Sequence, residues 1–185
     1  MAKILPITRL GDPILRKKGR LLAVNEITSS KIQQLIANMR YTVEKKGYGV
    51  GLAAPQVGES LALSLIAIKP TPTRPNLERF ESVLINPQVT KTFGKPKDMW
   101  EGCISCGNDQ DTLYARVSRY KKIELTWIDE TGKDHREILT DFIAHVAQHE
   151  TDHTNGIVFV DRVKDTSSYM MADEYRKRIA KKKIQ

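Results

Sequence analysis

Residues 140–156 constrain the fold more than any other segment, because they combine the signals of a helix with a dense group of titratable side chains. Thr140 or Asp141 can cap the start of a helix, and Asn155-Gly156 is a good C-terminal stop. Between them the mainly apolar run FIAHVA leads into QHETDH, residues 148–153. We therefore expect a helix with a packed side that gathers two imidazoles and two carboxylates near its end.

The spacing of the two histidines in QHETDH predicts a metal site. Residues four apart in a helix point about 40° from each other, so His149 and His153 can hold one ion between them. Glu150 sits beside the pair and can exchange a proton with a water that the metal activates, as in the H-E-x-x-H pattern. The alternative is a chance pattern on a solvated helix face, but only four histidines occur in the whole chain. The stretch therefore indicates a metal-dependent hydrolase.

Two histidines leave such a site one protein ligand short, because hydrolytic metal sites usually take three. His145 lies one turn before His149, but three histidines on successive turns rise about 6 Å each and do not converge on one ion. We read it as a neighbour of the site or a packed histidine. The C-x-x-C pair Cys103 and Cys106 offers thiolates, although such a pair is also typical of redox centres and of half a structural zinc site. The residues alone leave the two cysteines nearly tied.

The remaining pattern predicts an α+β fold, because helices and strands do not alternate regularly. Helices are expected at 30–45 and 166–182, in addition to the one that begins near Thr140. Strands are expected at 61–68, 81–89, 121–129 and 136–140, with a proline-rich loop at 69–79 and a hairpin turn at 130–133. We expect small antiparallel or mixed sheets around a central metal-binding helix, with N-terminal and C-terminal helices.

Length and composition favour one soluble domain over residues 1–185. No apolar run reaches the roughly 18 residues that span a bilayer, and the N-terminus lacks the pattern of a secretory signal. With two cysteines, a reducing compartment is favoured, and we expect the bacterial cytoplasm, with an organelle as the alternative and no membrane association. The net charge is +8, and residues 166–185 are expected to form a basic helix or tail. This tail is either a solvated end or a surface that faces nucleic acid.

Three stretches in order resemble the motifs of peptide deformylases, the metal hydrolases that remove the N-formyl group from nascent proteins. They are GVGLAAPQVG at 49–58, EGCIS at 101–105 and QHETDH at 148–153. The likeness extends from ITRLGDPILRKKG near the N-terminus to NGIVFVDRV near residue 163. The resemblance implies a hydrolase that acts on a linear amide in N-terminal protein processing.

The resemblance also assigns roles to residues. It implies that the metal ligands are Cys103, His149 and His153. Glu150 would be the general base and acid for a metal-activated water that attacks the formyl carbon, while Gln56 and the backbone N–H of Ile104 would stabilise the oxyanion. These roles meet the chemical need for a Lewis acid and for donors aimed at developing charge. The family's usual metal is iron(II), and zinc, nickel or cobalt can take its place.

The family further suggests how an N-formyl-methionyl peptide would bind. It would lie extended beside Val50 and Gly51 in the manner of an added strand, with the methionine side chain in an apolar pocket. That pocket would be lined by Ile104, Val146 and, as a further candidate, His145. Some deformylases dock on the ribosome through a C-terminal helix, a role that the basic tail could serve. Glu101 and Arg119 resemble an ion pair of the family that lies behind the metal ligands, and a surface pair is the alternative.

The chain also departs from the family pattern. Ile104 replaces a usual leucine, Cys106-Gly107 stand where a proline commonly follows, and the loop from 106 to 118 is longer than usual. Cys106 has no role in the family, and Asp152 either orients a neighbouring side chain or faces solvent. Two alternatives therefore remain at this point: a hydrolase for another N-acyl substrate, and a basic RNA-binding or ribosome-binding protein with a vestigial site.

Overall fold

The structure, a computed structural model, describes residues 1–47, 49–70 and 75–180. In this part of the chain the helices are α1 (Val24–Ile27), α2 (Ser30–Lys46), α3 (Asp141–Thr154) and α4 (Ala172–Tyr175). The strands are β1 (Gly51–Ala53), β2 (Leu63–Ile68), β3 (Phe80–Phe93), β4 (Lys97–Gly102), β5 (Leu113–Arg119), β6 (Lys122–Ile128), β7 (Asp134–Thr140) and β8 (Met170–Met171). Short 3-10 turns connect several of them, and a π-helical turn, Arg176–Ala180, follows α4.

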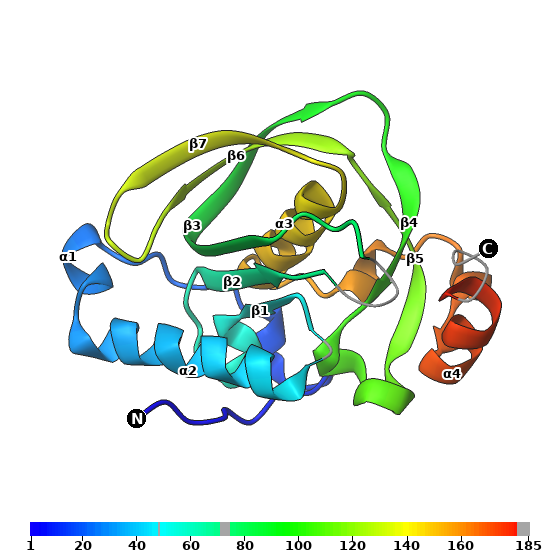
Figure 1. The fold of residues 1–185 in the computed structure, drawn as a ribbon, viewed down its shortest axis with the longest axis horizontal. Helices are drawn as coiled ribbons and strands as arrows, with labels where there is room; N and C mark the ends of the chain where they lie inside the picture. Colours follow the sequence, from blue (N-terminus) through cyan, green and yellow to red (C-terminus); the bar gives the residue numbers. More distant parts are fainter. Residues whose placement is uncertain (48, 71–74, 181–185) are drawn as a thin grey trace.

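The strands form two antiparallel sheets. One has the order β1-β2-β3-β6-β7 and the other the order β4-β5-β8. Figure 1 shows α3 in the middle of the molecule, with α2 outside β1 and β2 and with α4 beside β5. The chain is therefore α+β with small antiparallel sheets, as predicted.

The five-stranded sheet has apolar side chains on both faces because helices cover both. Along β2, Leu63 and Leu65 belong to the cluster that includes the buried side of α2, whereas Ile66 and Ile68 pack with α3. Alternate residues of a strand point to opposite faces, so this near-continuous apolar strand fills two cores. A third cluster, around Cys103 and Phe159, lies against the three-stranded sheet. In the site helix α3, 10 of the 14 residues are buried, so the helix is packed from several sides.

Most predicted elements are found close to their predicted bounds. In α2, the Ser29 hydroxyl accepts a hydrogen bond from the N–H of Ile32 at 3.4 Å, and Gly47 ends the helix with a φ of 70°. The hairpin turn before β7 is held by Asp129, whose carboxylate accepts bonds from the N–H groups of Thr131 and Lys133. β3 extends to Phe93, beyond the predicted 81–89, with register shifts that absorb an irregular stretch. Residues 71–74 of the predicted loop lie outside the described residues.

Two details of the predicted helices are wrong. Neither Thr140 nor Asp141 caps α3 with its side chain: Thr140 occupies the N-cap without such a bond, and Asp141 has a φ of 49°. Instead the N–H of Asp141 donates to the carbonyl of Lys121 at 2.7 Å, because β7 leads straight into the helix beside β6.

The predicted helix at 166–182 begins only at Ala172. Asp165 closes a turn by accepting from the N–H and hydroxyl of Ser167, and the next residues pair with β5 as strand β8. Side-chain bonds of this kind compete with helix formation. Residues 181–182 of the prediction lie outside the described ranges. None of the helices within these ranges is both long and apolar enough to cross a lipid bilayer.

Candidate active site

Three side chains that could hold a metal ion come together from two parts of the fold. Cys103 follows β4, while His149 and His153 lie four residues apart on α3. Their candidate ligand atoms all lie within 4.8 Å of one another, and Cys103 Sγ is 3.3 Å from His153 Nε2. Cys103 and His153 are 3% and 1% exposed. Helical spacing alone explains why the two histidines lie close together. The Cys103 thiol is placed beside them by the position of β4 in the fold.

The chemistry of this group fits a divalent ion. His149 Nδ1 lies 2.9 Å from Glu101 Oε2, so its other ring nitrogen is left for an ion. His153 Nδ1 is buried and has no hydrogen-bond partner among the described residues. A hydrogen bond from Cys106 outweighs burial and, with the nearby histidines, holds the pKa of the Cys103 thiol well below its usual range. One thiolate and two imidazoles are a favourable ligand set for zinc and iron(II).

A buried network of charges stands behind the metal-ligand candidates. Arg119 donates to both oxygens of Glu101 at 2.6 and 3.0 Å and to Asp152 at 2.6 Å. Burial alone would raise the pKa of Glu101, but hydrogen bonds from His145, His149 and Arg119 hold it well below its usual value. Asp152 also pairs with Arg162 at 2.6 Å and is 7% exposed. It therefore belongs to the network and does not face solvent.

His145 is a neighbour of the group and not part of it. Its Nε2 lies 2.9 Å from Glu101 Oε1, so Glu101 contacts both His145 and His149. Cys106 is half-buried and packs beside Cys103, and the Cys103 hydrogen bond together with burial raises its pKa. Among the described residues, the ligand group contains Cys103 and excludes Cys106.

Glu150 points into the site from the helix turn between the two histidines. It is 3% exposed, and its Oε2 has no hydrogen-bond partner in the described part of the chain. Burial raises the pKa of this carboxyl to about 7. A Cβ atom added at Gly51 would lie 2.2 Å from Glu150 Oε1, so the glycine leaves space for the carboxylate. The group can thus accept and donate a proton near neutral pH.

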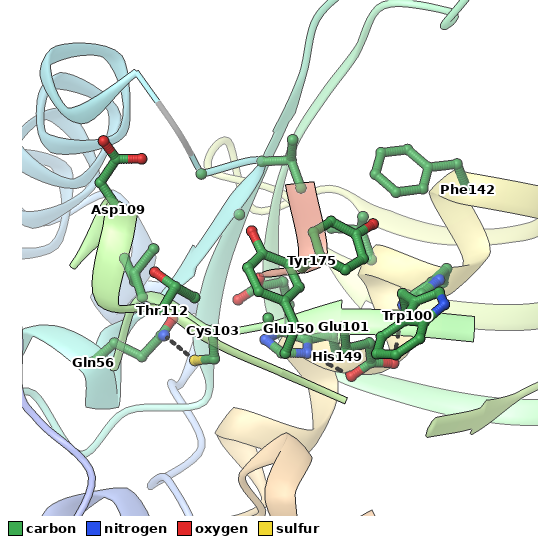
Figure 2. A pocket seen from close by; sticks show the side chains of 18 of the residues that line it. Gln56, Trp100, Glu101, Cys103, Asp109, Thr112, Phe142, His149, Glu150 and Tyr175 are labelled. Atoms are coloured by element: carbon green, nitrogen blue, oxygen red, sulfur yellow. Dashed lines mark hydrogen bonds and ion pairs between the residues drawn. The ribbon is translucent and has the colours of Figure 1, made fainter. Parts of the chain in front are cut away.

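Gln56 is oriented by its own backbone. Its Oε1 accepts from the N–H of Ala53 at 2.8 Å, which turns the amide NH₂ toward the site. That NH₂ donates to Cys103 Sγ and to Ser105 Oγ, both at 3.2 Å, and Figure 2 shows the bond to the sulfur. A side chain held in this way presents fixed donors beside the candidate ligands.

One pocket of about 210 Å³ gathers these residues. Of the site residues singled out from the sequence, His153, Arg119, Asp152 and Cys106 do not line the pocket, and the others do. The lining residues are Gly49, Val50, Gly51, Gln56, Trp100, Glu101, Gly102, Cys103, Ile104, Asp109, Thr112, Tyr114, Phe142, His145, Val146, His149, Glu150, Tyr175 and Arg176.

Sequence reasoning missed the aromatic part of this pocket. Trp100, Tyr114, Phe142 and Tyr175 line it, and Figure 2 shows Tyr175 near the centre of the view. No spacing rule joins Tyr114 to Tyr175, because strand pairing between β5 and β8 brings them together. The available signal was that aromatic residues are rare, at 6% of the chain, so each one is a candidate for a specific role.

Comparison with known proteins gives one consistent family. The sequence model of the family described as polypeptide deformylase matches residues 4–169. The chain is 36% identical over 180 residues to peptide deformylase 2 of Nostoc sp., and the match covers 97% of each chain. It is 34% identical over 171 residues to a peptide deformylase of Leptospira biflexa, and that match covers 88% of this chain and 89% of the relative.

Solved structures agree with these relatives. A Met-Ala-Ser-bound class I type b peptide deformylase from Acinetobacter baumannii has a TM-score of 0.80 and 30% identity, covering 88% of this chain and all of that one. A Synechococcus elongatus deformylase in complex with actinonin has a TM-score of 0.75 and 31% identity, covering 94% of this chain and 85% of that one.

Proposed function

The chain belongs to the polypeptide deformylase family, hydrolases that deformylate nascent peptides, and we propose that it removes the formyl group from N-formyl-methionyl peptides and releases formate. The observation that carries this proposal is the meeting of Cys103, His149 and His153 with Glu150 and Gln56 around one pocket. Each catalytic need of amide hydrolysis has a candidate side chain there.

We propose that Cys103, His149 and His153 hold one divalent ion, iron(II) in the working enzyme, with zinc, nickel or cobalt as substitutes. Bound there, the ion would polarise the formyl carbonyl and make a water more acidic. Glu101 and Arg119 act as positioning residues, because Glu101 fixes the ring of His149 and Arg119 fixes Glu101. Such partners set which ring nitrogen faces the ion.

Glu150 is the proposed proton carrier. It takes a proton from the attacking water as the bond to the formyl carbon forms, and it gives that proton to the amine nitrogen as the carbon–nitrogen bond breaks. Its burial supports both steps, because a carboxyl whose pKa is about 7 changes protonation state at little cost near neutral pH. Formate and a free N-terminal amine leave.

Gln56 and Ile104 are the proposed oxyanion donors. The Gln56 amide is already turned toward Cys103 by its bond to Ala53. Cys103 is the N-cap of the 3-10 turn that starts at Ile104, so the N–H of Ile104 is at a position without a partner inside the turn. Donors fixed in advance are worth more than donors that must reorient.

The substrate is proposed to lie along β1 as an added strand. Among the described strands β1 is an edge of the five-stranded sheet and pairs with β2 alone, and Val50 and Gly51 line the pocket. Edge strands accept extended peptides through their main chain. The methionine side chain then lies against Val146, which is 4% exposed and lines the pocket, with Ile104 nearby.

Formate release measures the proposed function directly. Protein prepared without oxygen and loaded with iron(II) or nickel is expected to turn over formyl-Met-Ala-Ser. Acetyl-Met-Ala-Ser is the matched control, because a preference for acetyl would favour another N-acyl substrate. Glu150→Ala should retain one metal per chain and lose about 10²- to 10⁴-fold in kcat. No turnover by fully metallated wild-type protein would refute the proposal.

Ribosome association is proposed for the basic residues after Arg176. Lys177 and Arg178 have side chains that are 72% and 66% exposed, and both also contact Glu174. Residues 181–185 lie outside the described part of the chain. Deletion of 177–185 leaves the pocket residues in place and should weaken cosedimentation with ribosomes. Binding of the shortened protein should also depend less on salt concentration than binding of the full chain, because the deleted lysines and arginine contact phosphates in the proposed complex. Unchanged cosedimentation across salt concentrations would remove this role.

A further inference from the structure

The C-terminal arm, residues 170–180, forms one wall of the pocket although it lies outside the three motifs. β8 fixes its start by pairing with β5, with Met170 opposite Tyr114. Ala172 is fully buried at the start of α4, and Tyr175 and Arg176 then line the pocket. The arm is therefore a built part of the site and not only a tail.

Tyr175 is held in place by an aromatic stack on β4 and β5. Its ring is parallel to that of Tyr114, with an interplanar angle of 1° and centroids 4.1 Å apart, and it meets Trp100 at 59° and 5.5 Å. The Tyr114 ring in turn covers Gly102, where an added Cβ would lie 2.7 Å from the ring. Gly102 directly precedes Cys103, so the stack starts beside the proposed metal ligand and ends at Tyr175.

A second contact joins the arm to the loop between β4 and β5. The Arg176 guanidinium donates to the carboxylate of Asp109 at 2.6 Å and to its carbonyl at 3.1 Å. Asp109 also lines the pocket, and its φ of 33° is unusual for a residue other than glycine. The arm and the loop thus close the same side of the pocket together.

The aromatic wall and the methionine wall are made by different elements. Phe142 and Val146 come from α3 and Val50 lies next to β1, whereas Tyr114 and Tyr175 come from β5 and α4. Successive side chains of an extended peptide point in opposite directions. A peptide whose methionine points to the α3 wall therefore turns the side chain of its next residue away from that wall. Tyr114 and Tyr175 are large side chains of the same pocket that do not belong to the α3 wall.

We propose that Tyr175, supported by Tyr114 and Trp100, is a specificity-determining residue that contacts the side chain of the residue after formyl-methionine and favours aromatic side chains there. This inference rests on the proposed function and deepens it. Ring pairs add to the burial of apolar surface, and the resulting preference for phenylalanine over alanine is expected to be roughly three- to tenfold in kcat/KM.

The test compares formyl-Met-Phe-Ser with formyl-Met-Ala-Ser. The ratio of the two kcat/KM values does not depend on the fraction of active enzyme, so a loss of folded protein does not imitate the effect. The ratio should fall to about one in Tyr175→Ala and stay at the wild-type value in Tyr175→Phe. Tyr41→Ala is the matched control, because Tyr41 is a half-buried tyrosine on α2 that does not line the pocket. Its ratio should equal that of wild type.

Binding of the products separates this inference from the proposed function. The peptides Met-Phe-Ser and Met-Ala-Ser are titrated into nickel-loaded wild-type and Tyr175→Ala protein by calorimetry. A Tyr175-dependent preference in binding supports the contact even in a protein that releases no formate. The opposite outcome is normal formate release with the same kcat/KM ratio of formyl-Met-Phe-Ser to formyl-Met-Ala-Ser in wild-type, Tyr175→Ala and Tyr175→Phe protein. That result overturns the contact and leaves the proposed function standing.

Discussion

Replacing Arg119 by methionine tests the buried network most severely. The side chains of Arg119, Glu101 and Asp152 are 5%, 2% and 10% exposed, and Arg119 makes three hydrogen bonds to the two carboxylates. Hydrogen bonds to charged groups contribute about 1.5–3 kcal/mol each. The substitution would remove all three but keep most of the side-chain length, so the cavity that it leaves is small.

The expected loss is smaller than the sum of three bonds. Glu101 keeps its contacts with His145 and His149, and Asp152 keeps Arg162. Removing one partner of a buried ion pair typically costs about 3–5 kcal/mol, and we expect Arg119→Met to lower the free energy of unfolding by about 4 kcal/mol. A typical domain has only about 5–15 kcal/mol in total.

Urea unfolding of metal-loaded protein measures this loss, and the same titration with a chelator shows how much of it acts through the metal. Arg116→Met is the matched control. Arg116 lies on the same strand and pairs with Asp165 at 2.7 Å, but the two side chains are 45% and 48% exposed. Such exposed pairs contribute about 0–1 kcal/mol. Equal losses in the two variants, or a loss below about 1 kcal/mol for Arg119→Met, would refute the reasoning.

Three further predictions concern single sites. Gly51→Ala should lower kcat about tenfold or more, because the added Cβ displaces Glu150. Gly49→Ala is the control and should stay within a few-fold of wild type, since a Cβ there has no neighbour nearer than 3.7 Å. Equal activities of the two variants in a formate assay would contradict this. Cys103→Ser should lose the metal in elemental analysis while Cys106→Ser keeps one ion per chain, and the reverse result would reassign the ligand. An arginine hydrogen bond and the N–H of Ala23 lower the pKa of Glu26 from 4.5 to about 2, so its contribution to stability is present above pH 4.5 and is lost as the pH falls through 2. The difference in Tm between wild type and Glu26→Gln should therefore shrink from pH 6 to pH 2, and a constant difference would argue against this linkage.

Local patterns in the sequence predicted the helices whose ends and buried faces are set by residues close together in the chain. The helix α2 has a serine cap, a regular apolar face and a glycine stop, and its predicted bounds of 30–45 agree with Ser30–Lys46. The spacing of His149 and His153 placed two ligand candidates on one helix face. Periodicity and capping need no knowledge of the rest of the chain.

The parts that sequence reasoning missed depend on contacts between distant segments. β4, β5 and β8 were not predicted, because a two-residue strand such as Met170–Met171 exists only through its pairing with β5. The choice between Cys103 and Cys106 was open for the same reason, since the position of a thiol relative to α3 is set by tertiary packing. Asp152 likewise gained its role from Arg119 and Arg162, which no helical spacing connects to it.

The two sheets share no strand pairing within the described ranges, and the pocket lies on the seam between them. Cys103 stands on one side of this seam and the two histidines on the other, and His149, the nearer of them in sequence, follows Cys103 by 46 residues. An ion held by all three would act as a cross-link that closes a loop of this length, which by the chain-entropy relation for disulfides stabilises the fold by about 4 kcal/mol. If the three side chains hold the ion as proposed, catalysis and the joining of the two halves depend on the same group, and a variant that binds metal weakly should lose stability and activity together.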